Sequence, residues 1–166
     1  IKLLSTVFNK ENIPSDDKPD IVLAGRSNVG KSSFVNCLFN SKIARTSSTP
    51  GKTRSINIYD VDNLYNIVDL PGFGYARVGK AERIKWAELI DDYFSIRKNI
   101  VFAFHIVDSR VEIPESDIFL QEYLNSKGVP FSIILNKTDK LNQSEKAKSL
   151  NRIRGYINAG GKEIRV

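Results

Sequence analysis

The residues best suited to chemistry form segment 25–32, GRSNVGKS, which fits the pattern G-x-x-x-x-G-K-[ST]. The segment follows a short apolar run at 21–24, which predicts a buried strand, and it opens a helix predicted for 32–40. Glycines at this spacing let backbone N–H groups curl around phosphates at the positive end of the helix. Lys31 is expected to neutralise the β- and γ-phosphates, and the Ser32 hydroxyl to ligate Mg²⁺. The segment therefore predicts a nucleotide phosphate site; the alternative is a chance Gly/Ser turn.

A second candidate, DLPG at 69–72, ends the second of two apolar runs, RSINIYDV and NLYNIVDL. Their short link predicts an antiparallel hairpin. Ligand loops of an open α/β sheet lie at the carboxyl ends of its strands. Asp69 is therefore expected to hold Mg²⁺ through water, and the Gly72 N–H to meet a γ-phosphate. On its own, DLPG is also compatible with an ordinary turn.

A third candidate, NKTD at 136–139, follows the apolar run 131–135. The carboxylate of Asp139 can accept hydrogen bonds from N1–H and the amine of guanine, a donor pair that adenine lacks. Asn136 is expected to tie this loop to the phosphate loop, and the Lys137 stem to cover the base. NKTD alone is a common loop sequence, but as the third motif in this order it favours GTP over ATP. An ATP-dependent kinase or transport ATPase is the alternative.

The elements that must position these loops alternate along the chain. Continuous apolar runs predict central parallel strands, and apolar positions at helical spacing predict helices between them. Such alternation predicts an α/β sheet with right-handed crossovers. Besides those already named, the predicted strands lie at 100–107 and from 163 onward, and the predicted helices at 82–97, near 115–127 and near 144–157.

Several other residues receive structural interpretations. Residues 1–19 are expected to be an extension ahead of a domain spanning 20–166, with Asp16, Asp17 and Asp20 in a solvated linker. The helix at 32–40 is expected to turn Phe34, Val35, Cys37 and Leu38 inward, which makes Cys37 a core residue. His105, within a predicted central strand, is expected to be a core histidine. Trp86, Leu89 and Tyr93 form a helical stripe for which core packing is favoured over a partner site.

Composition and charge limit the classes of protein and of partner that fit this sequence. The chain has 166 residues and a net charge of +6, and its single cysteine excludes an internal disulfide and fits a reducing cytoplasm. Its longest apolar run, 100–107, is too short to span a bilayer. Segment 140–166 has seven basic residues and two acidic ones, which indicates either a polyanionic partner such as RNA or a solvated basic helix. Because the sequence contains no methionine, we expect it to be less than a complete gene product.

Four stretches, GRSNVGKSS, ARTSSTPGKTRSIN, DLPGFGYARV and WAELIDDYF, carry a family resemblance. In sequence and spacing they resemble the EngB (YihA/YsxC) family of translation-factor-like P-loop GTPases, which is linked to bacterial ribosome assembly. The likeness runs from about residue 20 to the end. It implies a Ras-like P-loop GTPase: a three-layer α/β/α domain with a mostly parallel six-stranded sheet and one antiparallel hairpin strand. It also implies that the family's last guanine loop and final helix, expected after residue 166, are missing.

The resemblance also bears on single residues. It makes Thr53 the switch I threonine that completes the Mg²⁺ shell in the GTP state, which suits a hydroxyl on a loop that closes only over a γ-phosphate. Most relatives carry Thr where this chain has Asn136, the commoner GTPase residue. Phe73 occupies the place of the glutamine that positions the attacking water in Ras-like enzymes, so slow hydrolysis is expected. Relatives with an apolar residue there often use K⁺, and Asn28 is the hypothetical K⁺ ligand; its alternative role is a hydrogen bond within the loop.

The function expected from these features is a cytoplasmic, monomeric GTPase switch. It is expected to bind GTP and GDP with Mg²⁺, to act in assembly of the large ribosomal subunit through rRNA or ribosomal proteins, and to be needed for normal septation. The basic switches, around 44–55 and 72–84, are expected to dock on rRNA in the GTP state. The alternative is a nucleotide-gated binding module with negligible hydrolysis, which Phe73 permits.

The predicted site residues fall into three overlapping groups. Those expected to act in catalysis are Lys31, Thr53, Gly72 and Asn28, and those expected to hold the metal are Ser32, Thr53 and Asp69. The nucleotide-binding set is Gly25, Arg26, Ser27, Asn28, Val29, Gly30, Lys31, Ser32, Ser33, Gly51, Lys52, Thr53, Arg54, Ser55, Asp69, Leu70, Pro71, Gly72, Asn136, Lys137, Thr138 and Asp139.

Overall fold

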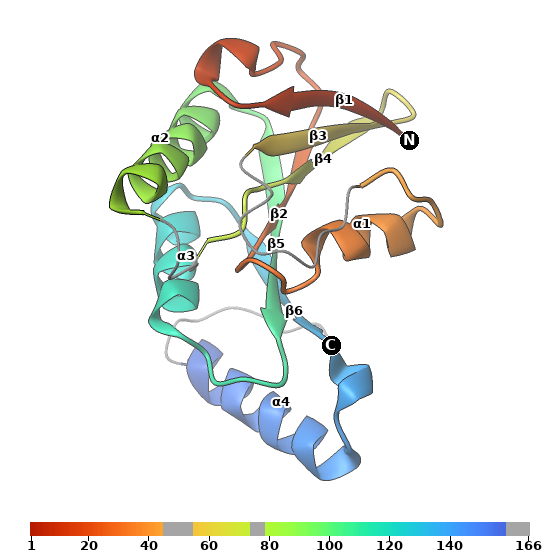
Figure 1. Ribbon diagram of the computed structural model, residues 1–166, viewed down its shortest axis with the longest axis vertical. Helices are drawn as coiled ribbons and strands as arrows, with labels where there is room; N and C mark the ends of the chain where they lie inside the picture. Colours follow the sequence, from red (N-terminus) through yellow and green to blue (C-terminus); the bar gives the residue numbers. More distant parts are fainter. Residues whose placement is uncertain (45–54, 74–78, 159–166) are drawn as a thin grey trace.

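A twisted sheet with helices on both faces forms the molecule (Figure 1). The computed structural model describes residues 1–44, 55–73 and 79–158. The sheet has six strands in the order β1-β3-β4-β2-β5-β6. The strands are β1 (Lys2–Val7), β2 (Asp20–Ala24), β3 (Ile56–Val61), β4 (Tyr65–Asp69), β5 (Ile100–Asp108) and β6 (Phe131–Asn136). The helices are α1 (Lys31–Leu38), α2 (Lys80–Ile96), α3 (Glu115–Ser126) and α4 (Gln143–Asn158), with short 3₁₀ turns η1 (Lys10–Asn12) and η2 (Thr138–Lys140).

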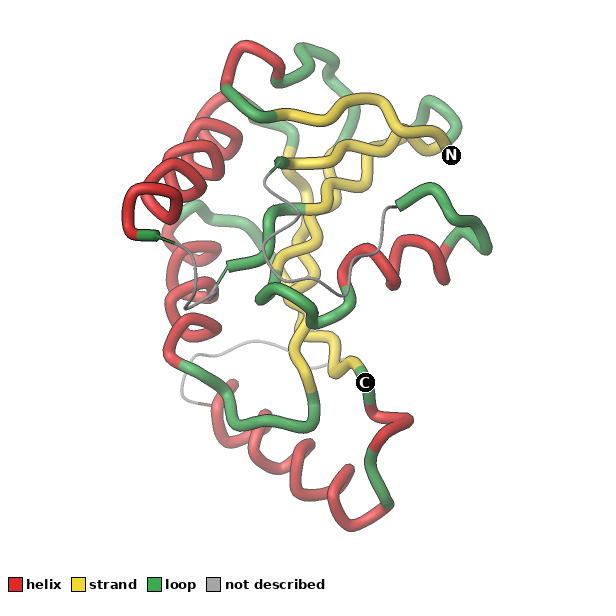
Figure 2. Tube along the Cα trace, viewed as in Figure 1, coloured by secondary structure: helices red, strands yellow, loops and turns green. Residues whose placement is uncertain are grey.

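The predicted fold class, a three-layer and mostly parallel α/β/α sheet, is confirmed. Strand β2 pairs in parallel with β4 and β5, and β5 pairs in parallel with β6. Strand β3 alone runs the other way, antiparallel to β4 and to β1. Helix α1 lies on one side of the sheet and α2 and α3 on the other (Figures 1 and 2). Because β2, β4, β5 and β6 run in one direction, the loops that follow them leave from the same edge.

Two apolar clusters form the core, one on each face of the sheet. The alternation of strand side chains divides β2 between them: Val22 and Ala24 join the cluster with α2, α3 and α4, and Leu23 joins the cluster with α1. Leu89 and Tyr93 are buried as predicted, whereas Trp86 is only half-buried. Within the described residues, no helix is long and apolar enough to cross a membrane.

The segment before residue 20 differs from its prediction as a simple extension. Strand β1 pairs antiparallel with β3, from Lys2 opposite Asp60 to Val7 opposite Ile56, and so forms an edge of the same sheet. Its sequence KLLSTV does not alternate strictly between apolar and polar residues, and a register shift between Leu3 and Ser5 interrupts the pairing. The strand predicted from residue 163 lies outside the described residues.

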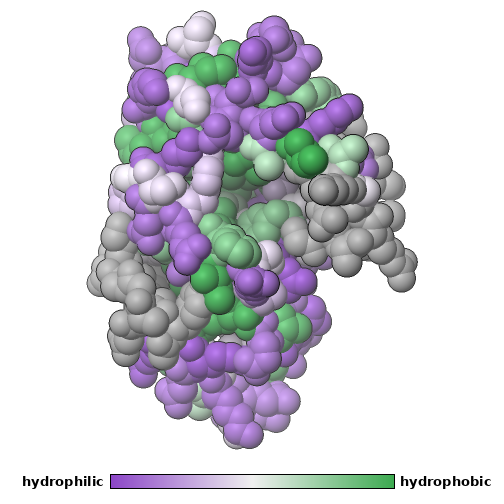
Figure 3. Space-filling model, turned by 90° about the vertical axis from the view of Figure 1, so that its left-hand side faces the viewer, coloured by the Kyte–Doolittle hydropathy of each residue, from purple (hydrophilic) through white to green (hydrophobic). Residues whose placement is uncertain are grey.

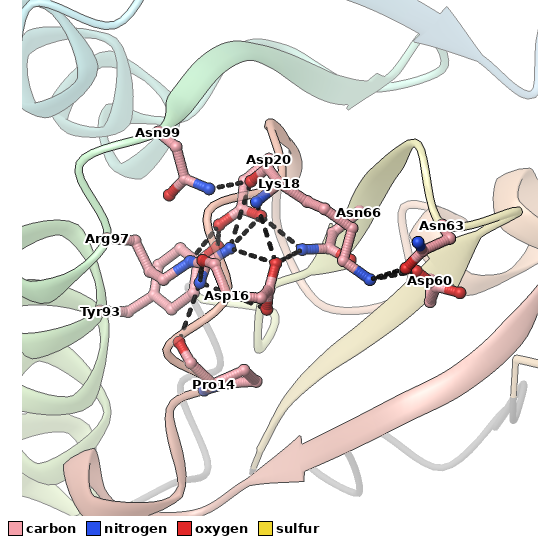
Figure 4. Close-up of polar contacts among 10 residues, drawn as sticks. All are labelled: Pro14, Asp16, Lys18, Asp20, Asp60, Asn63, Asn66, Tyr93, Arg97 and Asn99. Carbon is pink, nitrogen blue, oxygen red and sulfur yellow. Dashed lines mark hydrogen bonds and ion pairs between the residues drawn. The ribbon is translucent and has the colours of Figure 1, made fainter.

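The prediction that Asp20 lies in a solvated linker is wrong. Asp20 is fully buried and accepts hydrogen bonds from Arg97 Nε at 2.7 Å, Arg97 Nη2 at 2.8 Å, Tyr93 Oη at 2.5 Å and Asn66 Nδ2 at 2.9 Å. Arg97 also donates to the Pro14 carbonyl at 2.8 Å and contacts Asp16, which is only partly exposed (Figure 4). The carboxylate is buried because Arg97, at the end of α2, pairs with it. Asp17 is exposed, as expected.

The inward face predicted for α1 is wrong at two positions. Cys37 is exposed and Leu38 is 54% exposed, whereas Val35 is fully buried. Cys37 lies about 200° around the helix from Val35 and therefore points to the opposite side. Because α1 has only eight residues, its apolar pattern did not determine which face of the helix packs against the core. Cys37 is a surface thiol in the part of the chain described.

Candidate functional site

The phosphate loop connects β2 to α1, with Gly30 as the residue before the helix. Gly30 has a left-handed backbone, φ 106°, which favours glycine. A Cβ there would lie 2.3 Å from Asn136 Nδ2, so the position also lacks room for a side chain. Asn136 uses this close approach to donate to the Val29 carbonyl at 2.7 Å. The predicted tie between the third loop and the phosphate loop is therefore present.

Lys31 lies at the centre of the phosphate loop. Its side chain is buried, and Nζ donates to the carbonyls of Gly25 at 3.0 Å and Arg26 at 3.1 Å. Burial lowers the pKa of Lys31, and the charges of Asp69 and Asp117 oppose that shift. Neutral carbonyls compensate an ammonium less than a carboxylate or phosphate does. The cation is thus held where an anionic ligand would improve its partners.

The expected metal site brings together Ser32 and Asp69. Ser32 Oγ donates to Asp69 Oδ2 at 2.7 Å, while the buried Asp69 Oδ1 has no hydrogen-bond partner among the described residues. Burial raises the pKa of Asp69, and Lys31 and the Ser32 hydrogen bond only partly offset it. Hydroxyl and carboxylate oxygens are ligands that Mg²⁺ prefers, and an unpaired buried oxygen is what a cation or its water shell would satisfy. These residues fit Mg²⁺, although no cluster of three His, Cys, Asp or Glu occurs in the described ranges.

The DLPG segment lies directly on the phosphate loop. The Ser27 N–H donates to the Phe73 carbonyl at 3.1 Å, and Phe73 forms a parallel bridge with Arg26. A Cβ at Gly72 would lie 2.5 Å from Ser27 Cα and 3.1 Å from Lys31 Nζ, so only glycine allows this approach. Gly72 therefore lies next to Lys31, and Phe73 is joined to the phosphate loop through Arg26 and Ser27.

The third loop presents Asp139 on its outer side. Lys137 has a left-handed backbone, φ 64°, and its Nζ donates to the Asn28 carbonyl at 2.5 Å and to Asp108 Oδ2 at 2.9 Å. Asp139 is 69% exposed and pairs with Lys140 at 3.2 Å. Its carboxylate is accessible for a base. The predicted roles of Asp139 in reading guanine and of the Lys137 stem in covering it stay predictions.

The sequence analysis missed Asp108, which ends β5 at the same edge. Asp108 also accepts two hydrogen bonds from Arg110, at 2.9 and 2.7 Å. Burial favours a higher pKa for Asp108, but the hydrogen bonds from Arg110 and Lys137 prevail and lower it. Asp108 thus holds Lys137 in place against the phosphate loop. The available signal was its position directly after the apolar run 100–107.

The remaining predicted residues divide into three groups. Val29, Leu70 and Pro71 are buried and shape the loops, and Leu70 N–H donates to the Leu23 carbonyl at 3.1 Å. Ser33 and Asn28 are exposed, and Ser55 is buried directly before β3. Gly51, Lys52, Thr53 and Arg54 lie outside the described residues, as do the parts of both switches at 45–54 and 74–78.

His105 is a satisfied core histidine, as predicted. It is fully buried on β5, with Nε2 3.0 Å from Asp117 Oδ1 and Nδ1 3.4 Å from Gln121 Nε2. Because Gln121 Nε2 is a donor only, His105 Nδ1 accepts, and His105 Nε2 carries the proton that is donated to Asp117. His105 therefore has structural partners on both sides.

Comparison with known proteins agrees with this geometry. Residues 20–137 match the family described as 50S ribosome-binding GTPase. The probable GTP-binding protein EngB of Thermotoga maritima is 47% identical over 150 residues, which cover 90% of this chain and 77% of that protein. The corresponding protein of Petrotoga mobilis is 45% identical over 163 residues, covering 98% of this chain and 83% of its own length.

Solved structures give the same result. The crystal structure of a probable GTP-binding protein EngB has a TM-score of 0.66 at 29% identity, covering 84% of this chain and 80% of that chain. Era, in a complex with MgGDPNP and nucleotides 1506–1542 of 16S ribosomal RNA, has a TM-score of 0.64 over 89% of this chain and 50% of its own. At 20% identity Era shows the fold alone.

Fold and motifs together define a P-loop GTPase with guanine nucleotides as its ligands. The chain belongs to the 50S ribosome-binding GTPase family and, within it, to the EngB GTP-binding proteins.

Proposed function

We propose that this EngB GTPase is a slow, Mg²⁺-dependent switch that acts in the cytosol, as a monomer, during assembly of the large ribosomal subunit, and that normal septation depends on it. Its GTPase domain would span 20–166, and the preceding segment would add β1 to the edge of its sheet. The observation that carries the proposal is the convergence of three loops at one edge of the sheet. Asn136 joins the third loop to the first, Ser32 joins the first to Asp69, and Gly72 lies against Ser27.

Slow hydrolysis is proposed because Phe73 has no group that can orient water. Phosphoryl transfer depends mainly on positioning and charge, so the reaction would be slowed rather than abolished. Lys31 and Mg²⁺ on Ser32, Thr53 and Asp69 would neutralise the phosphates, and the Gly72 N–H would contact the γ-phosphate. The role of Asn28 as a K⁺ ligand stays a prediction. It is tested by comparing the GTP turnover rate in K⁺ buffer with that in Na⁺ buffer, with Asn28→Ala as the control.

The ribosomal partner is proposed from three supports. The matching family is described as 50S ribosome-binding, the structural neighbour Era was solved with ribosomal RNA, and the chain carries a net charge of +6. Cosedimentation with ribosomal subunits in GDP and in a nonhydrolysable GTP analogue tests the switch. Equal association in GDP and in the GTP analogue would contradict the switch.

A gated module with negligible hydrolysis is the second candidate, favoured by Phe73. Multiple-turnover phosphate release separates it from a slow enzyme.

Recognition of guanine by Asp139 is tested by Asp139→Asn, which is expected to weaken GTP binding by a factor of about 100 or more and to shift the nucleotide preference to XTP. An unchanged preference for GTP would show that Asp139 does not recognise guanine. Asp17→Asn, at an exposed position, is the control.

A further inference from the structure

A polar pocket lies beside the third loop, between the segment that follows β5 and α4. Figure 1 shows this segment passing over α4 on its way to α3, and Figure 3 shows hydrophilic side chains gathered over this lower end of the molecule. The pocket has a volume of about 330 Å³. Its lining includes Ser109, Arg110, Glu112, Glu145, Lys148 and Arg152. None of these residues belongs to the predicted nucleotide site.

The acidic groups of this pocket already have partners. Glu112 Oε1 accepts from Arg152 at 2.6 Å, and Glu145 Oε2 accepts the backbone N–H of Asn142 at 2.8 Å. Lys148 is exposed, and within residues 1–44, 55–73 and 79–158 no ion pair is found for it. Lys148 therefore brings to the pocket an ammonium group that is not engaged by a carboxylate in the described part of the chain.

Hydrogen-bond donors also remain available. A guanidinium carries five N–H donors. Arg110 directs Nε and one Nη at Asp108, and Arg152 directs one Nη at Glu112, so both keep further donors. The Ser109 side chain is 2% exposed, and its Oγ has no partner among the described residues. A buried hydroxyl without a partner is uncommon, and a polar ligand atom at this position would satisfy it.

We propose that this pocket binds a backbone phosphate of an RNA strand. A phosphate has acceptor oxygens for the lysine, the spare guanidinium donors and the hydroxyl, and the open, charged lining does not suit an apolar ligand. The inference rests on the proposed function, since RNA is the partner proposed there, and it assigns the contact to α4 rather than to the switches.

The carboxylate of Asp108 connects the pocket to the nucleotide site. Asp108 accepts from Arg110 on the pocket side and from Lys137 on the nucleotide side. An occupant that draws Arg110 from Asp108 changes the environment of Lys137, which also bonds to the phosphate loop. The contact thereby links an RNA strand to the loop expected to hold the base.

The test measures binding of a 20-nucleotide oligouridylate RNA to the full chain across a salt series. Lys148→Gln is expected to lower affinity about fivefold at 0.1 M salt and to reduce the slope of log K against log salt by about 0.7, the loss of one phosphate contact on a single strand. Arg154→Gln removes the same charge from an exposed position of α4 outside the pocket lining, and is expected to change affinity less than about twofold.

Equal effects of the two substitutions would overturn the proposal that the pocket binds RNA, and so would absence of RNA binding by the wild type. Binding of inorganic phosphate alone that depends on Lys148, without RNA binding, would identify a free anion as the ligand and refute RNA. Labelled GDP is titrated into every variant in parallel. Retained GDP binding with no RNA effect sinks this inference alone, whereas loss of guanine-nucleotide binding by the wild type sinks the proposed function.

Discussion

The two ends of the sheet bury charge in different ways. At the amino end, Asp20 accepts four hydrogen bonds, from Arg97, Tyr93 and Asn66, and all distances lie between 2.5 and 2.9 Å. At the carboxyl end, Asp69 accepts one from Ser32 and keeps an unpaired oxygen. Lys31 there donates to two backbone carbonyls. The Asp20 carboxylate is therefore fully paired, although the buried Oδ1 of the neighbouring Asn66 has no hydrogen-bond partner among the described residues. Asp69 and Lys31, in contrast, would gain partners from a bound cation and a bound anion.

Protonation equilibria reflect the same contrast. Burial alone would lower the pKa of Arg97, but its hydrogen bonds to Asp20 and Asp16 prevail and raise it. At Asp69 and Lys31 burial prevails, raising the pKa of Asp69 and lowering that of Lys31. Asp108 on the same edge differs, because hydrogen bonds from Arg110 and Lys137 lower its pKa. Shifts against the charged form are typical of groups that await a ligand. Charge at the amino end stabilises the fold, whereas at the carboxyl end it is kept for binding.

The strongest test of this contrast is Arg97→Ala. It leaves Asp20 buried without its cation, so the free energy of unfolding is expected to fall by about 3–5 kcal/mol. Nucleotide affinity of the remaining folded protein is expected to stay within about twofold, because the network lies at the opposite end of the sheet. Urea unfolding and labelled-GDP titration measure the two quantities.

Lys98→Ala, at an exposed neighbouring position, is the matched control and is expected to change stability by less than about 0.5 kcal/mol. If Arg97→Ala proves no more destabilising than Lys98→Ala, the amino-end network does not stabilise the fold.

A second test, Asp69→Asn, is expected to stabilise the nucleotide-free protein while abolishing Mg²⁺-dependent hydrolysis. The gain is about 1.4 kcal/mol for each unit by which the pKa is raised. Because a raised pKa favours the protonated folded state, wild-type stability falls as pH rises from 3.8 through the folded pKa. The advantage of the variant is therefore absent below pH 3.8 and grows toward neutrality.

Denaturant titrations between pH 3 and 7, with EDTA present, measure this difference, and exposed Asp17→Asn is the control. A variant that is less stable at pH 7 would show that the Asp69 carboxylate supports the fold, which would erase the contrast between the two ends.

The sequence predicted the carboxyl end far better than the amino end, for a physical reason. Phosphate and guanine chemistry demands fixed residue types at fixed spacing, so segments 25–32, 69–72 and 136–139 are visible in isolation. The Asp20–Arg97 pair joins residues 77 positions apart, and only the folded sheet reveals it. Strand β1 was missed for a related reason, since an edge strand has one partner and a weak apolar pattern. Asp108 was missed because no motif includes it.

The smallest effect is expected from Asp16→Asn at the amino end, and its pH dependence has the opposite sign to that of Asp69. Burial favours a higher pKa for Asp16, but hydrogen bonds from Asn66 and Arg97 outweigh it and lower the pKa below 3.8. Its stabilisation is therefore present above pH 3.8 and is lost as pH falls through the folded pKa. Because Asp16 is 27% exposed, the loss at pH 7 is expected to be only about 0.5–1 kcal/mol.

The same denaturant series, again with Asp17→Asn as reference, measures this loss. Asp16→Asn and the wild type should converge toward pH 3, whereas Asp69→Asn and the wild type should diverge as pH rises from there. Parallel curves for the two variants would mean that both carboxylates experience one kind of environment. The division into a paired end and a ligand-seeking end would then be wrong, because opposite signs follow only if partners prevail over burial at Asp16 and burial prevails at Asp69.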